Sequence, residues 1–137
     1  MLIENPGKEY KSTSTTVYSC QYHIVWATKY RRHLLEDKIQ ERFKELVLSK
    51  QKDYDFEILE METMSDHVHL LLSHAPKIST SLLVSRLKGY TATILRSEFP
   101  ELISRAPSLW TRSKFVSTVG SVKLETVKQY IAGQKGK

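Results

Sequence analysis

Two kinds of hydrophobic periodicity alternate along the chain, and their order restricts the fold more than any other feature of the sequence. Residues 15–28, TTVYSCQYHIVWAT, contain no glycine or proline, and aromatic or apolar side chains occupy every second position from Tyr18 to Trp26. A period of two predicts a long β-strand. Three further segments rich in apolar and β-branched residues predict strands over residues 55–64, 66–74 and 109–120.

Three other segments repeat apolar residues with the period of an α-helix. They are residues 36–51, 79–97 and 121–134, the last with Ser121 as its N-cap. Spacings of three and four residues place each apolar stripe on one side of a helix. The stripes are, in order, Ile39, Phe43, Leu46 and Val47; Leu83, Leu87, Tyr90 and Ile94; and Leu124, Val127 and Ile131.

The order of these elements predicts an α+β fold with a ferredoxin-like, or RRM-like, split β-α-β arrangement. The elements follow one another as β-α-β-β-α-β-α, and the first six form an antiparallel sheet with two helices on one face. A chain of 137 residues suffices for one domain with a real core. We expect a polar leader at residues 1–14 and a single domain over residues 15–137. The second face of the sheet needs a cover, either the last helix or a second subunit.

Charge and cysteine content restrict the partners and the compartment. The formal net charge is +6 and the sequence pI is near 9.4, which favours a polyanionic partner, although many basic proteins have none. The single cysteine, Cys20, excludes an intramolecular disulfide and is typical of a reducing cytoplasm. No segment has the character of a transmembrane helix or a signal peptide. We expect a cytoplasmic protein that does not bind membranes.

Two histidines open the third predicted strand, in the segment SDHVHLLLSH, residues 65–74. On a strand, His67 and His69 point to the same side with Cα atoms roughly 6.5–7 Å apart, so both imidazoles can reach one metal ion. Val68 and Leu70 then point toward the helices. For an isolated His-x-His pattern, a solvated sheet face is the commoner explanation, by about two to one. Two ligands are also too few, because a working site needs a third protein donor.

The last predicted helix offers a third donor. Tyr130 and Gln134 are four residues apart and therefore share one helical side. The amide oxygen of Gln134 can act as the missing ligand, which would place the Tyr130 hydroxyl beside the metal. A phenol is a weak nucleophile at neutral pH and needs a strong electrophile, such as a metal-bound phosphodiester. A tyrosine in a short amphipathic helix is, however, more often a packing residue, by about three to one.

Together these segments resemble the small single-tyrosine HUH transposases of the IS-200/IS-605 insertion-sequence type. The resemblance covers residues 17–134 and rests on four blocks in order, HIVWATKYRR, MSDHVHLLLS, SRLKGYTATILRSEFPEL and LWTRSKFVSTVGSVKLETVKQYIAGQ. It implies a DNA transposase that cleaves and rejoins single-stranded insertion-sequence ends folded into hairpins. His67 and His69 would bind a divalent metal, with Gln134 as the third ligand and Tyr130 as the nucleophile.

The resemblance also implies a chemistry and an assembly. Tyr130 would attack a scissile phosphate, leaving a free 3′-hydroxyl and a 5′-phosphotyrosine bond. Nitrogen ligands suit Mn²⁺, whereas cellular abundance favours Mg²⁺. The family works as a homodimer in which the tyrosine helix of one subunit lies over the histidines of the other, in trans. Gly120, before the last helix, is the predicted hinge, because glycine tolerates backbone angles that other residues do not.

Seven basic residues are candidates for contacts with the DNA backbone. For any single one of them, an ordinary solvated charge is about an equally common explanation. They are Lys29, Arg31 and Arg32 after the first strand, Arg86 and Lys88 in the second helix, and Arg112 and Lys114 in the last predicted strand. Tyr30, beside Arg31, can stack on an unpaired base or pack in the core.

Other interpretations of the same residues differ in what they explain. A histidine-triad hydrolase does not fit, because the third alternate position holds Leu71. A rolling-circle initiator or relaxase shares the histidine and tyrosine chemistry but usually has a longer chain. An RRM-like binding module would leave the pair of Tyr130 and Gln134 unexplained. An inactive or domesticated relative that binds hairpin or single-stranded nucleic acid stays an alternative.

Overall fold

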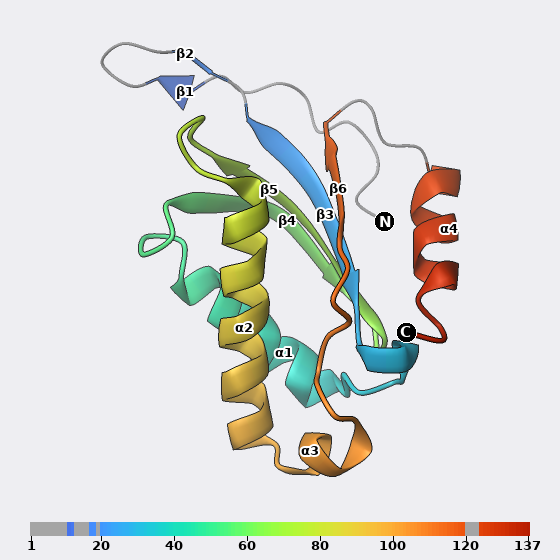
Figure 1. Cartoon of the computed structure of the whole chain (residues 1–137). Coiled ribbons are helices and arrows are strands. Elements are labelled where there is room, and N and C mark those ends of the chain that lie inside the picture. The colour runs from blue at the N-terminus through green and yellow to red at the C-terminus, as the bar shows by residue number, and fades with distance from the viewer. Residues whose placement is uncertain (1–10, 13–16, 19, 120–123) are drawn as a thin grey trace.

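A four-stranded antiparallel sheet organises the chain (Figure 1). The computed structural model describes residues 11–12, 17–18, 20–119 and 124–137. The sheet contains β3 (Gln21–Ala27), β4 (Phe56–Thr63), β5 (His67–His74) and β6 (Phe115–Thr118), in the spatial order β4-β5-β3-β6. All three neighbouring pairs are antiparallel. This is the predicted ferredoxin-like order, with the first and third strands of the sheet in its centre.

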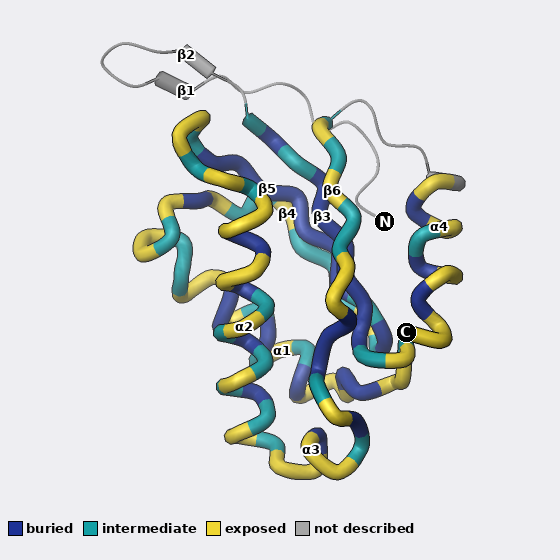
Figure 2. Tube along the Cα trace, in the orientation of Figure 1, coloured by how far each residue is buried: buried dark blue, intermediate teal, exposed yellow. Residues whose placement is uncertain are grey.

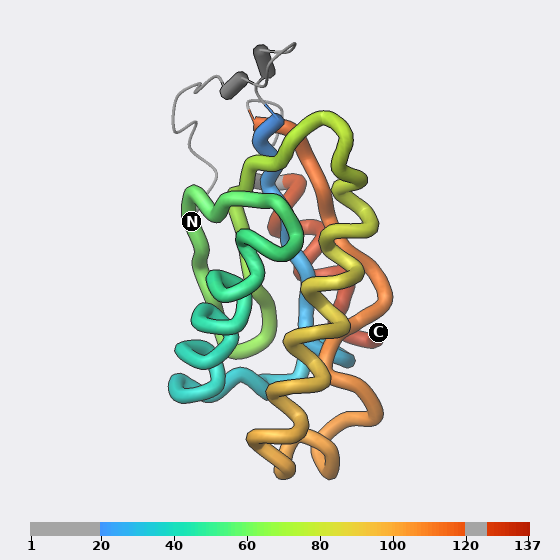
Figure 3. Tube along the Cα trace, turned by 90° about the vertical axis from the view of Figure 1, so that its left-hand side faces the viewer, coloured from blue at the N-terminus to red at the C-terminus, as the bar shows by residue number. Residues whose placement is uncertain are grey.

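Helices lie on both faces of this sheet. α1 (Asp37–Ser49) and α2 (Thr80–Glu98) cover one face, and α4 (Leu124–Gly133) lies on the opposite face (Figures 1 and 3). Two shorter elements, the 3-10 turn η1 (Lys29–Arg31) and α3 (Glu101–Arg105), connect the longer ones. The prediction of two helices on one face and a further helix at the C-terminus is confirmed. None of the described helices is long and apolar enough to cross a membrane.

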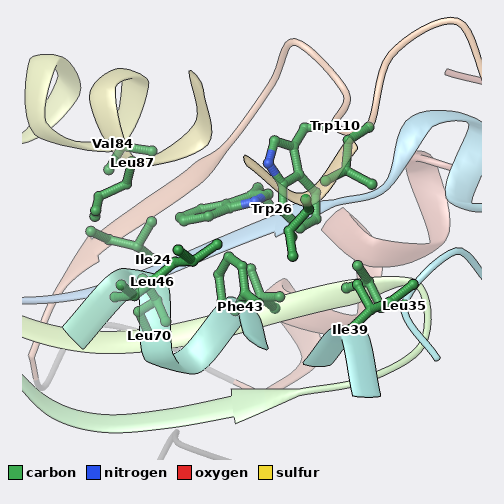
Figure 4. Close-up of a cluster of buried hydrophobic side chains, with 14 of the residues drawn as sticks. Ile24, Trp26, Leu35, Ile39, Phe43, Leu46, Leu70, Val84, Leu87 and Trp110 are labelled. Atoms are coloured by element: carbon green, nitrogen blue, oxygen red, sulfur yellow. The ribbon is translucent and has the colours of Figure 1, made fainter. Parts of the chain in front are cut away.

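The face toward α1 and α2 holds the main hydrophobic core (Figure 4). Alternate strand residues such as Ile24, Trp26 and Leu70 pack against the helices there. Trp26, Phe43 and Trp110 meet edge to face, with ring centroids 5.6–6.0 Å apart. Burying aromatic rings of this size contributes a large share of the hydrophobic stabilisation. All residues of the apolar stripes predicted for both helices belong to this core or pack against it.

The opposite face carries a much smaller apolar cluster under α4. Val25 of β3 packs with Val127 and Ile131 of α4, and the partly buried Phe115 and Tyr130 pack against them. Figure 2 shows the buried positions of α4 turned toward the sheet. The predicted stripe is confirmed for Val127 and Ile131, whereas the side chain predicted at residue 124 lies outside the described part.

A β-bulge in β4 sets which of its side chains face each helix layer. The pairing with β5 shifts between Ile58 and Glu60. A bulge of this kind inserts one extra residue and changes the face that the following side chains occupy. As a result, the apolar residues Phe56, Ile58 and Met61 face α1 and α2, and three glutamates face the α4 side, namely Glu57, Glu60 and Glu62.

The structure corrects the predicted extents of several segments. The segment predicted as the first strand contains two strands, β2 (Val17–Tyr18) and β3. β2 pairs with β1 (Lys11–Ser12), which lies in the segment predicted as a polar leader. The fourth strand begins only at Phe115, because Leu109 and Trp110 are buried in the core outside the sheet. The short helix α3 has no counterpart in the sequence prediction. Gly120 and Ser121, the predicted hinge and N-cap, lie outside the described residues.

Candidate active site and nucleic-acid surface

His67 and His69 lie on the sheet face that α4 covers, as their spacing predicts. Both pair with residues of β3, while Val68 and Leu70 belong to the core on the other face. The two imidazoles differ in environment, because the His67 side chain is 14% exposed and His69 is 1% exposed. One ring can therefore be reached from outside, and the other is enclosed by the protein.

A carboxylate orients the His67 ring. Asp66 Oδ1 lies 2.8 Å from His67 Nδ1, and Arg31 Nε donates to Asp66 Oδ2 at 2.8 Å. Burial would raise the pKa of Asp66, but the hydrogen bonds from Arg31 and His67 outweigh it, and the pKa is lowered. An ionised carboxylate only accepts hydrogen bonds, so His67 Nδ1 carries the proton. When the His67 ring carries this one proton, its lone pair is on Nε2, which is the atom that could bind a metal ion.

His69 meets a third histidine, which the sequence pattern does not single out. His23 Nδ1 lies 3.3 Å from His69 Nε2, and the two rings are inclined by 62°. Burial lowers the pKa of both imidazoles, and that of His69, which His23 lowers further, is about 4. Both rings are thus neutral at pH 7 and able to act as ligands. Only the register between β3 and β5 brings this pair together.

These imidazoles meet part of what a divalent metal site requires. His69 Nδ1 and His23 Nε2 are buried and have no hydrogen-bond partner in the described part of the chain, which is unusual for buried polar atoms. Among the described residues, no three histidine, cysteine, aspartate or glutamate side chains are grouped so as to hold a metal ion. His69, through its unpartnered Nδ1, and His67, through Nε2, are the candidates for two nitrogen donors. A complete site needs a ligand of another kind, such as an amide oxygen.

Tyr130 of α4 and Gln134, the residue directly after α4, both contact Ser113, in the segment before β6. Ser113 Oγ donates to Gln134 Oε1 at 2.8 Å and lies 3.1 Å from the Tyr130 hydroxyl oxygen. A serine hydroxyl has one proton to donate, so Tyr130 is the donor to Ser113. Burial raises the pKa of Tyr130, against the lowering effect of hydrogen bonds with Ser113 and Thr111. The phenol is therefore protonated at neutral pH in this arrangement.

Gln134 is buried but is not bonded to a histidine. Within the described residues, its amide group pairs with Ser113 and with the carbonyl of Tyr130. One contact nevertheless joins α4 to the histidine side of the site, because Arg31 Nη1 donates to the carbonyl of Ile131 at 3.4 Å. The last turn of α4 therefore lies beside the pair formed by Asp66 and His67.

The turn that carries Arg31 has an unusual backbone. Tyr30 and Arg31 have φ angles of 57° and 54°, a conformation that costs a residue other than glycine about 1 kcal/mol or more. Thr28 fixes this turn from within, since its amide and hydroxyl donate to the carbonyl of Asp66 at 3.0 and 3.2 Å. The one hydroxyl proton is shared with the carbonyl of Arg32, which lies closer, at 2.6 Å. Strain of this kind persists only where surrounding contacts impose it.

Four of the predicted DNA-binding residues, namely Lys29, Lys88, Arg112 and Lys114, line two cavities near this turn. Lys29 and Arg112 border a cavity of about 310 Å³ together with Ser113, Gln134 and the C-terminal residue Lys137. Arg112 also borders a second cavity of about 290 Å³ between α2 and residues 108–114, where Lys114 is a neighbour. That Lys29, Arg112 and Lys114 neutralise phosphates beside α4 stays a prediction.

Lys88, also predicted to bind DNA, is used inside the protein. Its Nζ donates to the carbonyls of Thr111 and Ser113 at 2.7 and 3.0 Å, which ties α2 to the segment before β6. Burial, with the charge of Lys114 as a smaller contribution, lowers the pKa of Lys88 to about 8. An ammonium group has three donors, and two of them are occupied here. Lys88 therefore supports the segment that contacts Tyr130.

The remaining three predicted DNA-binding residues also have partners within the chain. Arg31 pairs with Asp66, and Arg32 donates to the carbonyl of Arg105. Arg86 lies apart from the others, over the ring of Tyr54 at 5.9 Å, and borders a different cavity at the start of α2. The structure thus does not bring all seven predicted residues into one path.

Similar proteins are known. A family model described as "Transposase IS200 like" matches residues 16–134. The ISDra2 transposase TnpA of Deinococcus radiodurans is 31% identical over 131 residues, which cover 94% of each chain. The transposase for insertion sequence element IS200 of Salmonella typhimurium is 33% identical over 126 residues, which cover 90% of this chain and 82% of that relative.

Two solved structures share the fold. The crystal structure of a candidate transposase from Deinococcus radiodurans R1 superposes with a TM-score of 0.85 at 34% identity, and covers 93% of this chain and 99% of that one. A REP-associated tyrosine transposase bound to a REP hairpin superposes with a TM-score of 0.56, and covers 82% of this chain and 62% of that one. At 11% identity, this second similarity concerns the fold alone.

Proposed function

Because this chain belongs to the family of IS200-like transposases, we propose that it cleaves and rejoins single-stranded DNA at hairpin-forming insertion-sequence ends, with Tyr130 as nucleophile. One observation carries the proposal. The sheet face that holds His67 and His69 is the face covered by the helix with Tyr130 and Gln134, and Arg31 contacts both sides. Transfer of a phosphodiester to tyrosine needs a nucleophile and groups that hold an activating metal ion. These residues are candidates for both.

Hairpin DNA is the proposed form of the substrate. The REP-associated transposase with this fold is bound to a REP hairpin, which supports the proposal for this chain. The cavity bordered by Lys29, Arg112 and Lys137 also includes Ser113 and Gln134, so a strand entering it would reach α4. Basic side chains there would neutralise phosphates, and binding should weaken as salt rises.

We propose His67, His69 and Gln134 as ligands of Mg²⁺ or Mn²⁺. Asp66 holds the His67 ring with Nε2 free, and His69 is neutral at pH 7. Gln134 would exchange its hydrogen bond with Ser113 for the metal ion. When bound, the ion would act as a Lewis acid on a phosphate oxygen and position the scissile phosphate.

The proposed reaction exchanges one phosphate ester for another. The Tyr130 oxygen bonds to the scissile phosphorus while the bond from phosphorus to the 3′ oxygen breaks, which gives a 5′-phosphotyrosine and a 3′-hydroxyl. The Tyr130 hydroxyl leaves its hydrogen bond with Ser113 and gives its proton to solvent, and the 3′ oxygen takes up a proton from solvent, so the exchange balances. Attack of a 3′-hydroxyl on the phosphotyrosine reverses these changes, so rejoining consumes neither ATP nor water.

We further propose a homodimer whose active sites are shared in trans. In the single chain, α4 contacts its own sheet through a small cluster, with Val127 and Ile131 against Val25. Exchanging an element of this kind between identical subunits costs little, because each lost contact is replaced by its copy. Gly120, outside the described residues, keeps its proposed role as the hinge for this exchange.

The proposal is tested by incubating the protein with Mn²⁺ and labelled single strands from both flanks of its own gene. We expect an SDS-resistant adduct with a strand that folds into a hairpin. Tyr130→Phe should bind the same strand without forming an adduct, whereas Tyr90→Phe, at a partly buried tyrosine of α2, should react as the wild type does. Hairpin binding without an adduct in the wild type would instead support an inactive relative, and an adduct in Tyr130→Phe would exclude Tyr130 as nucleophile.

A further inference from the structure

Arg31 contacts the two halves of the candidate site at once. Its Nε donates to Asp66 Oδ2 at 2.8 Å, and its Nη1 donates to the Ile131 carbonyl at 3.4 Å. Asp66 in turn holds the ring of His67. One guanidinium group therefore connects a histidine of β5 with the last turn of the helix that carries Tyr130.

Both contacts of Arg31 have a defined direction. A guanidinium group is a rigid planar fork, so satisfying one partner fixes where its other donors point. Ile131 is in the last turn of α4, where backbone carbonyls attract positive charge, and its carbonyl accepts from the Gln134 amide at 3.1 Å as well as from Arg31. The described last turn of α4 contains no basic residue of its own. Arg31 supplies that charge from the turn beside the sheet.

The backbone of the turn directs Arg31 inward. Tyr30 and Arg31 both adopt positive φ angles. The neighbouring Thr28 amide bonds to the Asp66 carbonyl at 3.0 Å, and the Lys29 amide bonds to the Leu109 carbonyl at 2.8 Å. A side chain that served only as a surface charge would need no such conformation. The Arg31 side chain is 31% exposed and its partner Asp66 is 9% exposed, so the pair is largely enclosed.

We propose that Arg31 is a positioning residue that couples the placement of α4 to the orientation of His67. The inference rests on the proposed function of this site, and it replaces the sequence-based prediction that Arg31 binds DNA. Loss of Arg31 would release the last turn of α4 and leave the carboxylate of Asp66 free to turn away from His67. The role is the same whichever subunit supplies the α4 that lies over this sheet.

A phosphate ligand and a positioning residue give opposite patterns of measurements. A phosphate contact contributes to DNA affinity, and its loss lowers the slope of log affinity against log salt by about one. A positioning residue behind a metal ligand contributes to metal affinity, typically about 10- to 100-fold, without DNA being present. The order of α4 can be followed separately by hydrogen exchange of its backbone amides.

The experiment compares Arg31→Ala with Arg112→Ala and Lys44→Ala. Each variant loses one positive charge. Arg31 is at the proposed coupling site, Arg112 borders the cavity proposed to bind DNA, and Lys44 is in α1, away from both. Three quantities are measured: Mn²⁺ affinity by calorimetry without DNA, hydrogen exchange of α4, and affinity for the hairpin-forming strand from the gene flank at several salt concentrations. Lys44→Ala should match the wild type in all three.

For Arg31→Ala we expect Mn²⁺ affinity to fall by about tenfold or more, with faster exchange in α4 and an unchanged salt slope. For Arg112→Ala we expect unchanged Mn²⁺ affinity and a salt slope lowered by about one. Arg31→Lys keeps the charge but lacks the fork, so it should lose most of the Mn²⁺ affinity as well. If Arg31→Ala folds poorly, the Mn²⁺ affinity of Arg31→Lys relative to the wild type still tests the positioning role.

Two results would overturn the inference. Arg31→Ala could lower the salt slope by about one with normal Mn²⁺ affinity and α4 exchange, which is the behaviour of a phosphate ligand. Arg31→Ala and Asp66→Asn could also weaken Mn²⁺ binding additively when combined, which would show that the two residues act separately. A wild type that forms no adduct would refute the proposed reaction, whereas the metal and exchange measurements would still decide the role of Arg31.

Discussion

Toward α1 and α2, the central strands β3 and β5 present Ile24, Trp26 and Leu70 to a closed apolar core, but toward α4 they present His23 and His69. Among the described residues, twenty buried side chains form the first cluster and three form the second. Burial of apolar area stabilises in proportion to that area, whereas burial of an imidazole costs free energy unless it finds a partner. The apolar core on one face therefore provides most of the folding free energy. This offsets the cost of burying the imidazoles of His23 and His69 on the other face.

The difference also predicts where the molecule can move. α4 is held by the small cluster around Val127 and by hydrogen bonds to Ser113 and Arg31. Elements with few buried apolar contacts open at a lower free energy than the global unfolding free energy. We therefore expect α4 to detach from the sheet while the core on the other face stays folded.

The prediction with the largest expected effect tests whether Tyr130 of α4 works with the histidines of its own subunit or with those of the partner subunit. Homodimers of Tyr130→Phe and of His67→Ala should each form no adduct. In mixed dimers, wild-type histidines of one chain meet wild-type Tyr130 of the other if the helix acts in trans, so one working site should return. Adduct formation after subunit exchange, confirmed with two different tags, measures this. If confirmed mixed dimers stay inactive, the tyrosine acts in cis.

A second prediction compares one residue from each face. Phe43→Ala removes the ring that meets Trp26 and Trp110, and should lower the free energy of unfolding by about 3–5 kcal/mol. Val127→Ala removes two methyl groups from the smaller cluster and should cost about 1–2 kcal/mol. Urea unfolding measures the global effect, and hydrogen exchange of α4 should respond mainly to Val127→Ala. Equal global losses would mean that both faces form one cooperative core.

The pH dependence of stability should come in part from the α4 face. Burial lowers the pKa of His69 from 6.5 to about 4, so between these values the unfolded chain binds a proton that the folded chain does not. The free energy of unfolding should therefore fall as pH decreases through this window, by up to ~1.4 kcal/mol per pH unit.

His69→Asn should reduce this slope, whereas His33→Asn, at an exposed histidine outside the sheet, should retain it. Urea unfolding at pH 6.5 and pH 4.5 measures both variants against the wild type. A slope unaffected by His69→Asn would contradict the assignment of this pH dependence to the buried imidazole.

The smallest expected effect is at Gln134. Gln134→Ala removes the amide that accepts from Ser113, at a cost of about 0.5–1.5 kcal/mol in stability. It should slow adduct formation less than His67→Ala does, because water can replace an amide oxygen on a hard cation. Raising the Mn²⁺ concentration should restore Gln134→Ala and not His67→Ala. If both variants lost adduct formation equally and added Mn²⁺ restored neither, the Gln134 amide would be as necessary as the His67 imidazole.

Features that depend on neighbours within one element could be predicted from the sequence. The apolar stripes of α1 and α2 and the shared side of His67 and His69 follow from helix and strand periodicity alone. Contacts between elements could not be predicted. His23 reaches His69 only through the register of β3 and β5, and Ser113 meets Tyr130 only because α4 packs beside the segment before β6.

The segment before β6 shows the same limit for secondary structure. Leu109 and Trp110 have the apolar character of a strand, but their side chains are buried in the main core. The Trp110 indole donates to Thr91 of α2, and in the described part of the chain its β pairing is an isolated bridge with Thr28. Pairing with β3 begins at Phe115, opposite Val25. Here tertiary packing overrides the strand propensity of the sequence.

The bulge in β4 has an electrostatic consequence. It aligns Glu57, Glu60 and Glu62 along an outer strand of the sheet, on the side of the histidines. Glu60 and Glu62 are close enough to oppose in part the lowering of the His23 and His69 pKa values by burial. Carboxylates also repel phosphates within about 8–10 Å at physiological salt.

On the far side of β3, the segment before β6 carries Arg112 and Lys114 instead. The positions of these charges predict a potential that changes from negative at β4 to positive near β6, and we therefore expect DNA to approach the histidines from the β6 side. Glu60→Lys should make the potential at the β4 side less negative. The association rate with a labelled hairpin should then rise, and the rise should be largest at low salt. On this proposal, a single residue inserted in one strand sets the electrostatic polarity along which DNA would approach.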